Sequence, residues 1–159
     1  MGDNDLIHEE LDVLQSDIDD ESPQVLGVLI ERLLAEGVLD AHLTSLHMKR
    51  NRPGLRVEVL CHPTDRERFI RLLLAETSTL GVKARRVERY SLPRRFEEIQ
   101  VRGKPIRIKV ALLDGAPLRA VPEFSECQAL AESLRLPVRQ VLDEARAECA
   151  AWIARQRTS

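Results

Sequence analysis

The sequence predicts an α+β protein, in which a ferredoxin-like βαββαβ unit is followed by a β-hairpin and two C-terminal helices. Two observations carry this prediction. Between residues 10 and 94, segments with alternating apolar residues and segments with helical spacing follow one another in the order strand, helix, strand, strand, helix, strand. The chain of 159 residues, 43% hydrophobic and 31% charged, is also long and apolar enough to bury a core without disulfides.

Turn and capping residues bound the elements of the ferredoxin-like unit. Its first helix is expected to begin at Ser22-Pro23, because serine caps free amides and proline suits the first turn, and to end before Gly37. The capping box Thr64-Asp65-Arg66-Glu67 is expected to open the second helix. The four strands are expected over residues 11–18, 39–48, 55–60 and 82–92.

The whole chain divides into three predicted segments. Residues 1–9 form a flexible acidic tail, residues 10–94 the ferredoxin-like domain, and residues 95–159 a hairpin with a helical subdomain. The hairpin is expected to turn at Gly103-Lys104. A second capping box that starts at Ser125 opens the next helix, and Pro137 begins the last one.

Charge is strongly segregated along the chain, although the net charge is only −2. Residues 1–48 carry twelve acidic residues and one basic residue, whereas residues 49–109 carry 17 basic and seven acidic ones. A basic middle segment indicates an anion-binding region; the alternative is that the acidic and basic blocks neutralise each other across the fold. Nucleic acid is not expected as a partner, because the five aromatic residues are too few and too scattered for a stacking platform.

Several classes of protein are excluded. No apolar run approaches the roughly 18 residues of a membrane span, so no membrane association is expected. The three cysteines have no CxxC spacing and are odd in number, which indicates a reducing compartment such as the cytoplasm. Standard nucleotide loops, hydrolase elbows and HExxH zinc helices are absent from the sequence.

Two charged stretches are candidate sites. Asp17, Asp19 and Asp20 offer hard oxygen ligands of the kind that Mg²⁺ and Mn²⁺ prefer, although acids before a helix also stabilise its dipole without a metal. The stretch Lys49-Arg50-Asn51-Arg52-Pro53-Gly54 displays three cations on a stiff turn that can bind phosphate. The alternative for this turn is a solvated hairpin with protective charges.

Two further stretches carry weaker signals. Three hydroxyls, Thr77 to Thr79, end the second helix before Gly81, where hydroxyls and loop amides can line an oxyanion site or simply make a polar helix end. Arg85, Arg86 and Arg89 then charge both faces of the next strand, which indicates a subunit contact or a ligand face. Cys127 lies in the first turn of a helix, where the dipole lowers a thiol pKa, unless the cysteine is simply buried.

These stretches, in this order, resemble the C-terminal half of the nickel-insertion protein of the nickel-pincer cofactor pathway, the LarC type. The family pattern N-I-D-D-M-x-P-E is similar to Asp17–Gln24, M-K-x-N-R-P-G is matched fully by Met48–Gly54, and E-T-[ST]-T-[IL]-G-V-R is matched by Glu76–Val82. A family G-K is matched by Gly103-Lys104, and K-P-E-x-x-D-C partly by Pro122, Glu123 and Cys127. The departures from the family patterns are Asp17, Glu21, Gln24, Lys83, Val121 and Glu126.

The resemblance implies part of a CTP-dependent metallochelatase, a lyase that inserts Ni²⁺ into pyridinium-3,5-bisthiocarboxylic acid mononucleotide. In that family the C-terminal half binds CTP with Mn²⁺ or Mg²⁺ and forms homo-oligomers. The nucleotide-binding residues implied here are Lys49, Asn51, Arg52, Glu76, Thr77, Thr79, Arg86 and Lys104. The implied metal ligands are Asp17, Asp19 and Asp20, and the implied catalytic residues are Cys127 and Glu123.

The family's N-terminal, nickel-handling half has no counterpart in this sequence. The chain is therefore either a fragment or a stand-alone second half that meets its partner half in cis or in trans. Two other functions stay open from the residues alone: a nucleotide-binding module without chemistry, and a purely structural oligomerisation domain.

Overall fold

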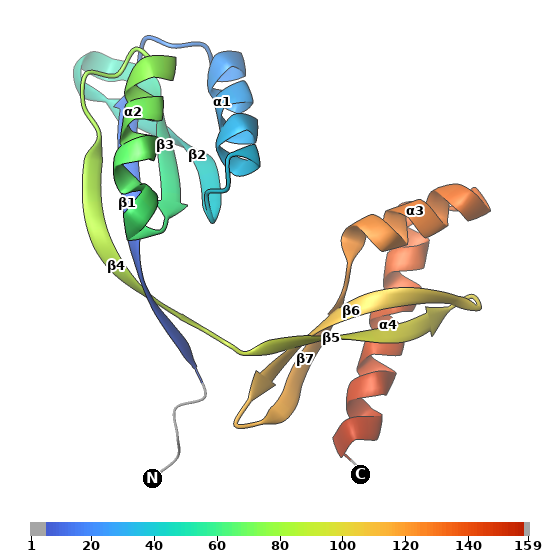
Figure 1. Ribbon diagram of the computed structural model, residues 1–159. Coiled ribbons are helices and arrows are strands. Elements are labelled where there is room, and N and C mark those ends of the chain that lie inside the picture. Colours follow the sequence, from blue (N-terminus) through green and yellow to red (C-terminus); the bar gives the residue numbers. More distant parts are fainter. Residues whose placement is uncertain (1–5, 158–159) are drawn as a thin grey trace. The chain divides into compact units, whose positions relative to one another are not determined.

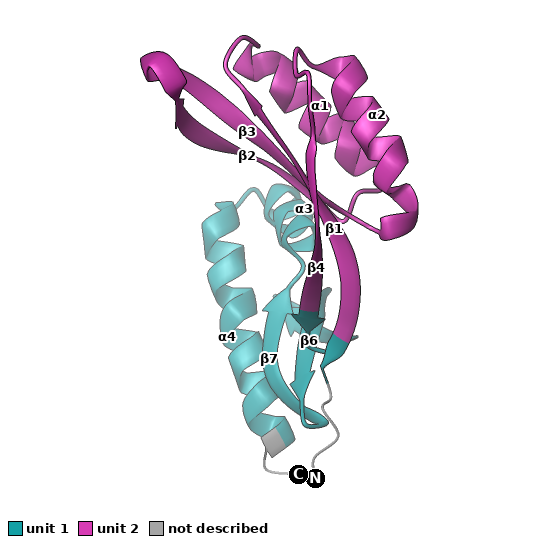
Figure 2. Cartoon of the chain, turned by 90° about the vertical axis from the view of Figure 1, so that its left-hand side faces the viewer, with its two compact units in different colours: residues 1–7, 90–159 teal, residues 8–89 magenta. Residues whose placement is uncertain are grey.

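The computed structural model describes residues 6–157, which belong to two compact units (Figure 2). One unit comprises His8–Arg89, and the other comprises the chain from Tyr90 onward together with the residues before His8. Among the described residues, no helix is long and apolar enough to cross a membrane.

The unit of residues 8–89 contains the predicted strand, helix, strand, strand, helix, strand order. Its elements are β1 (Ile7–Ile18), α1 (Pro23–Ala35), β2 (Asp40–Met48), β3 (Arg52–Cys61), α2 (Arg66–Glu76) and β4 (Lys83–Ser91). The strands lie side by side in the order β2-β3-β1-β4, and β3 is antiparallel to both of its neighbours. This strand order confirms the ferredoxin-like prediction.

One face of this sheet is covered by α1 and α2 (Figure 1). Alternate residues of the strands point towards the helices, so that Val57 and Val59 of β3 are fully buried against Leu26 and Leu33 of α1 and Phe69 of α2. Strand β1 begins at Ile7, four residues before the expected Leu11, so residues 7–9 of the predicted tail belong to the sheet. Residues 1–5 of that tail lie outside the described residues.

The predicted start of α1 is confirmed, whereas the predicted capping box of α2 is wrong, although α2 does begin within that stretch, at Arg66. Ser22 accepts a hydrogen bond from the Gln24 amide at 3.3 Å, and Pro23 begins α1. Gly37, with φ of +94°, follows the helix as expected. In place of the capping box at Thr64, residues Pro63–Asp65 form a 3₁₀ turn in which backbone carbonyls accept from the amides, so no side chain caps α2.

The second unit is a three-stranded antiparallel sheet with two helices on one face (Figure 1). Its elements are β5 (Arg94–Val101), β6 (Lys104–Leu113), β7 (Ala116–Pro122), α3 (Phe124–Leu134) and α4 (Val138–Arg157). The predicted hairpin is β5–β6, which turns at Arg102-Gly103, one residue earlier than the expected Gly103-Lys104, with positive φ at both turn residues. The buried faces of the sheet and helices meet around Ile108, Val110, Ala131, Val141 and Ala145.

Two details of this unit differ from the prediction. Strand β7 was not expected, although Asp114-Gly115, both with positive φ, is a hairpin signal before it. The predicted cap at Ser125 is wrong, because α3 already begins at Phe124. The Glu126 carboxylate of the expected box instead accepts from the backbone amide of Arg107 at 2.6 Å, which ties α3 to β6.

Gly54 lies on β3 where β1 and β2 meet it, and a side chain there has no room. A Cβ atom would come within 2.8 Å of the Ile18 carbonyl oxygen and would also collide with the Met48 sulfur. We predict that Gly54→Ala lowers the free energy of unfolding by about 1–3 kcal/mol, measured by urea denaturation.

The matched control is Gly27→Ala in α1, where no heavy atom lies within 4 Å of the added Cβ. We expect this change to stabilise the protein by about 0.5–1 kcal/mol, because alanine favours a helix interior. Equal stability of Gly54→Ala and the unaltered protein would show that the sheet gives way at this point.

Candidate functional site

Three of the stretches that sequence analysis singled out meet at one end of the first sheet. Strand β1 ends there, the β2–β3 turn lies beside it because Ile18 pairs with Leu55, and the loop from α2 to β4 closes the third side. We call the charged residues gathered here the acidic–basic cluster; they are Asp17, Asp19, Asp20, Arg52, Arg56 and Lys83.

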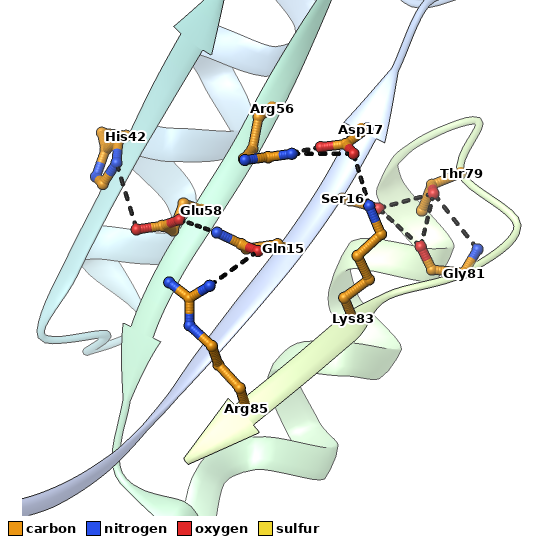
Figure 3. Close-up of polar contacts among 10 residues, drawn as sticks. All are labelled: Gln15, Ser16, Asp17, His42, Arg56, Glu58, Thr79, Gly81, Lys83 and Arg85. Atoms are coloured by element: carbon orange, nitrogen blue, oxygen red, sulfur yellow. Dashed lines mark hydrogen bonds and ion pairs between the residues drawn. The ribbon is translucent and has the colours of Figure 1, made fainter. Parts of the chain in front are cut away.

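Asp17 is the most strongly bound member of the cluster (Figure 3). Arg56 of β3 donates to both of its oxygens, at 2.7 and 3.2 Å, and the Lys83 ammonium of β4 donates to Oδ2 at 2.7 Å. The hydrogen bond from Arg56, opposed by burial and assisted by Lys83, lowers the pKa of the Asp17 carboxyl to about 2. The Asp17 carboxylate, a predicted metal ligand, is thus already paired with two cations, and its role as a ligand stays a prediction.

The other two carboxylates point to different partners. Asp19 accepts from Arg52 at 3.2 Å, and Asp20 accepts a short hydrogen bond from the Ser78 hydroxyl. Within residues 6–157, no three His, Cys, Asp or Glu side chains lie close enough together to hold a metal ion. The three aspartates therefore do not form a ready-made group of ligands, whereas Asp19 and Asp20 are adjacent and offer hard oxygen donors.

The turn between β2 and β3 presents its cations in a fixed shape. Residues Lys49–Asn51 form a single 3₁₀ turn, in which Arg50 and Asn51 have φ of 59° and 63°. Such left-handed backbone is uncommon for arginine, and the His47 ring holds it in place through a 2.7 Å hydrogen bond to Asn51 Oδ1. In the described part of the chain, Lys49 and Arg50 form no ion pair.

A pocket of about 360 Å³ opens beside the Arg52–Asp19 pair. Its walls combine apolar surface with two carboxylates and come from the end of β1, the start of α1 and strands β2 and β3; they include Ile18, Asp19, Glu21, Leu46, Pro53 and Leu55. An exposed arginine next to a pocket of this size suits a ligand with an anionic group and a flat, less polar part.

The predicted hydroxyls hold the loop in place and do not point into open space. Ser16 of β1 donates to Thr79 Oγ1 at 2.7 Å, and Thr79 donates to the Gly81 carbonyl at 3.0 Å (Figure 3). The Thr77 hydroxyl donates to the Leu73 carbonyl at 2.7 Å. The hydroxyl protons of Thr77 and Thr79 are thus used by backbone oxygens in this structure, and their predicted nucleotide binding stays a prediction.

Two predicted nucleotide-binding residues of the first unit lie apart from the cluster. Glu76 bonds to Arg32 of α1 at 2.6 Å. Arg86 forms ion pairs with the fully buried Asp12 at 2.7 Å and with Glu10 at 3.2 Å. Hydrogen bonds to Glu36 and, less strongly, to Glu76 raise the pKa of Arg32, and the hydrogen bond to Asp12 raises the pKa of Arg86. Both predicted residues join separate elements, and their nucleotide binding stays a prediction.

Three other predicted residues belong to the second unit. Lys104 begins β6, and Glu123 accepts from Lys109 at 3.0 Å. Cys127 is fully buried among the residues between sheet and helices, and burial raises the pKa of its thiol. The expected lowering of the Cys127 pKa by the helix dipole is therefore wrong: the residue does lie in the first turn of α3, but it faces the core, where a thiolate is disfavoured. Its catalytic role stays a prediction.

Sequence reasoning missed Arg56 of the cluster and Ser16, which holds the neighbouring loop, whereas it named Ser78 only as one of three hydroxyls. The signal for Arg56 was present, because it alternates with Leu55 and Val57 on β3 and so had to lie on the sheet face away from the helices. The same face carries a polar chain from Arg85 through Gln15 and Glu58 to His42 (Figure 3).

The depressed pKa of Asp17 predicts how stability depends on pH. The folded carboxyl binds its proton more weakly than the unfolded one, so its stabilisation is complete above about pH 4 and is lost as pH falls towards 2. We expect Asp17→Asn to cost about 1–3 kcal/mol of unfolding free energy at pH 7 and much less at pH 2.5, measured by urea denaturation.

The control for this measurement is Asp40→Asn, at the exposed start of β2, which should leave the pH profile unchanged. A pH profile of Asp17→Asn parallel to that of the unaltered protein would contradict the assigned ion pair.

All three thiols are expected to be unreactive in the folded protein. Cys61, Cys127 and Cys149 are buried, and burial raises the pKa of each thiol. A colorimetric disulfide reagent at pH 8 should label none of them within minutes, and all three after denaturation. Rapid labelling that disappears in Cys127→Ser would restore that residue as a surface nucleophile.

Comparison with known proteins agrees with the fold and the motifs. The family model "Nickel insertion protein" matches residues 1–142. A curated relative from Myxococcus xanthus is 43% identical over 135 residues, which are 85% of this chain and 35% of that protein. A relative from Acetivibrio thermocellus, named pyridinium-3,5-bisthiocarboxylic acid mononucleotide nickel insertion protein, is 34% identical over 86% of this chain and 33% of its own length.

Two solved structures share the fold. The C-terminal domain of a cyclometallase involved in the synthesis of the NPN cofactor of lactate racemase superposes with a TM-score of 0.84, at 27% identity, over 89% of this chain and 98% of that one. A protein from Methanopyrus kandleri superposes with a TM-score of 0.64, at 31% identity, over 88% of each chain. The present chain spans about a third of the length of the curated relatives that it matches. It belongs to the nickel insertion protein family, and it corresponds to the C-terminal, LarC-type domain.

Proposed function

We propose that this chain is the nucleotide-binding part of a nickel-inserting enzyme, and that it binds CTP with Mn²⁺ or Mg²⁺ at the acidic–basic cluster. The observation that carries the proposal is the exposed Arg52, whose partner Asp19 lines a pocket of about 360 Å³. Lys49 and Arg50 of the same rigid turn add two cations without ion-pair partners among the described residues. Together these side chains can neutralise a polyphosphate, while the pocket receives the flat base.

The carboxylates of the cluster divide into two roles. Asp19 and Asp20 fit a divalent cation that shares phosphate oxygens and water as its remaining ligands, because such ions are commonly held by one or two carboxylates. Asp17 does not fit, since Arg56 and Lys83 occupy it. Bound there, the cation would supply charge neutralisation to the phosphates. Arg52 would exchange its bond to Asp19 for one to phosphate and so release that carboxylate for the cation.

Nickel enters the proposal as a substrate. The Acetivibrio relative is named for nickel insertion into pyridinium-3,5-bisthiocarboxylic acid mononucleotide, and we propose the same substrate for the protein to which this domain contributes. We further propose that the domain works with the family's N-terminal part, in cis or in trans, as a homo-oligomer. Three free cysteines suit the reducing cytoplasm as its location.

The second candidate is an oligomerisation module without chemistry. It is favoured by Val25 and Val28 on the outer side of α1, which are 45% and 66% exposed and border a small hollow with Arg32 and Glu76. Nucleotide binding distinguishes the candidates, because a ligand at 100 times its dissociation constant adds about 2.7 kcal/mol to stability. A melting temperature that no nucleotide changes would favour the oligomerisation module.

The central prediction concerns Arg52. Equilibrium dialysis of this chain with CTP and Mn²⁺ should show that Arg52→Gln weakens binding about tenfold or more, because a charged hydrogen bond to phosphate contributes about 1.5–3 kcal/mol. Asp19→Asn should reduce the dependence of CTP binding on Mn²⁺. A panel of nucleotides should show a preference for CTP over ATP and GTP.

Arg139→Gln is the matched control, because Arg139 is 92% exposed on α4 in the other unit. The affinity of this variant for CTP should equal that of the unaltered chain. Melting curves should show that all variants are folded. If Arg52→Gln and Asp19→Asn both bind CTP and Mn²⁺ normally, the nucleotide site lies elsewhere.

A further inference from the structure

The outer face of the second sheet carries a group of cations that the proposed nucleotide site does not use. Helices α3 and α4 cover only the other face, where Ile108 and Val110 point. Because side chains alternate along a strand, the outer face receives Arg94 and Phe96 from β5, Lys109 and Ala111 from β6, and Arg119 and Val121 from β7. All of these except Phe96 border a hollow of about 240 Å³.

The strand register places these residues on two neighbouring rows. Ala111 pairs with Arg94 on one side and Arg119 on the other, so two arginines flank one small side chain. With about 4.8 Å between strands, the backbones of the two arginines lie about 10 Å apart. Their long side chains can bend over Ala111 from both sides and contact the same anion. A β-bulge follows at Ala111/Leu112, a feature common beside binding sites.

The charges of this face are only partly balanced. Lys109 pairs with Glu123 at 3.0 Å, and Arg107 pairs with Glu126 at 3.3 Å. Among residues 6–157, the side chains of Arg94 and Arg119 have no ion-pair or hydrogen-bond partner. Two unbalanced guanidinium groups on one row repel each other unless an anion lies between them. Their combined charge matches a phosphate monoester, which carries about −1.5 to −2 at neutral pH.

The next row provides a surface for a ring. Phe96 is 53% exposed, and the Arg107 guanidinium lies 5.1 Å from its ring centroid. Aromatic rings and guanidinium planes both accept a stacked heteroaromatic ring. The face therefore offers an anion hollow and, beside it, a flat surface, which is the combination that an aromatic mononucleotide requires.

We propose that Arg94 and Arg119 bind the phosphate of a pyridinium mononucleotide over Ala111, with its ring against Phe96 and Arg107. This inference rests on the proposed function, since it assigns the substrate to a second site apart from the CTP site. The 240 Å³ hollow and its two unbalanced cations suit a monophosphate, whereas a triphosphate needs more volume and more positive charge.

Calorimetric titration of the whole chain with nicotinate mononucleotide tests the proposal, because this probe is a pyridinium mononucleotide with a ring carboxylate. Arg94→Gln and Arg119→Gln should each weaken binding about tenfold. The riboside without phosphate should bind far more weakly, and inorganic phosphate should compete with the mononucleotide. The matched control is Arg95→Gln on the same strand, whose side chain pairs with Glu97 at 3.0 Å, and it should bind normally.

Three results would overturn the proposal: no binding by the unaltered chain at millimolar probe, normal binding by both arginine variants, or equal binding of the riboside. A CTP titration separates this site from the first one. Arg94→Gln should bind CTP normally, and Arg52→Gln should bind nicotinate mononucleotide normally. If the unaltered chain ignores CTP yet binds the mononucleotide through Arg94 and Arg119, the proposed CTP site fails and this one stands.

Discussion

The interaction on which the first unit depends is the contact of Asp17 with Arg56 and Lys83. It joins side chains of β1, β3 and β4 on the sheet face that the helices leave open. Because β1 is a central strand, this carboxylate fixes the positions of both neighbouring strands where they approach the candidate site. Arg52 and the loop before β4 then have little freedom, and Asp19 and Asp20 follow directly along the chain.

The same logic extends along β1. Its acidic residues Glu9, Glu10, Asp12 and Asp17, and Asp19 directly after the strand, all pair with cations of β3 or β4. The segregation of charge in the sequence therefore serves largely to pair strands that are distant along the chain, which confirms that the two blocks neutralise each other. The cations left over, at the β2–β3 turn and on the second sheet, are the ones available to an anionic ligand. The basic residues that pair with acidic residues of β1 and most of those proposed to bind anionic ligands thus come from the same part of the sequence.

The fold could be predicted because local signals agreed with one another. Alternation defined the strands, Ser22-Pro23 and Gly37 bounded α1, and the order of elements matched one known topology. The two predicted capping boxes are wrong for different reasons. Before α2, a 3₁₀ turn satisfies the backbone amides in place of a side chain. In α3, the Glu126 carboxylate accepts from a backbone amide of β6. Strand β7 was not predicted because its apolar and polar residues do not alternate regularly, although Asp114-Gly115 is a turn signal before it.

The site was harder to predict than the fold. Sequence spacing brought Asp19, Asp20 and Arg52 together correctly, since three motifs end at one edge of a sheet. Spacing does not reveal orientation, and so Glu76 turned out to contact Arg32, and Cys127 to face the core. Cross-strand neighbours, such as the Arg94–Ala111–Arg119 row, become visible only when the register is known.

The central position of β1 has a consequence for how the chain folds. Strand β1, the earliest strand of its sheet along the chain, cannot complete its pairing until Lys83 and its neighbours, 66 residues later than Asp17, have left the ribosome. Contacts of such sequence separation slow folding, because the intervening loop must close before they form. Until then the apolar side of β1 stays exposed. The nascent chain must therefore avoid aggregation until all four strands of the sheet have been synthesised.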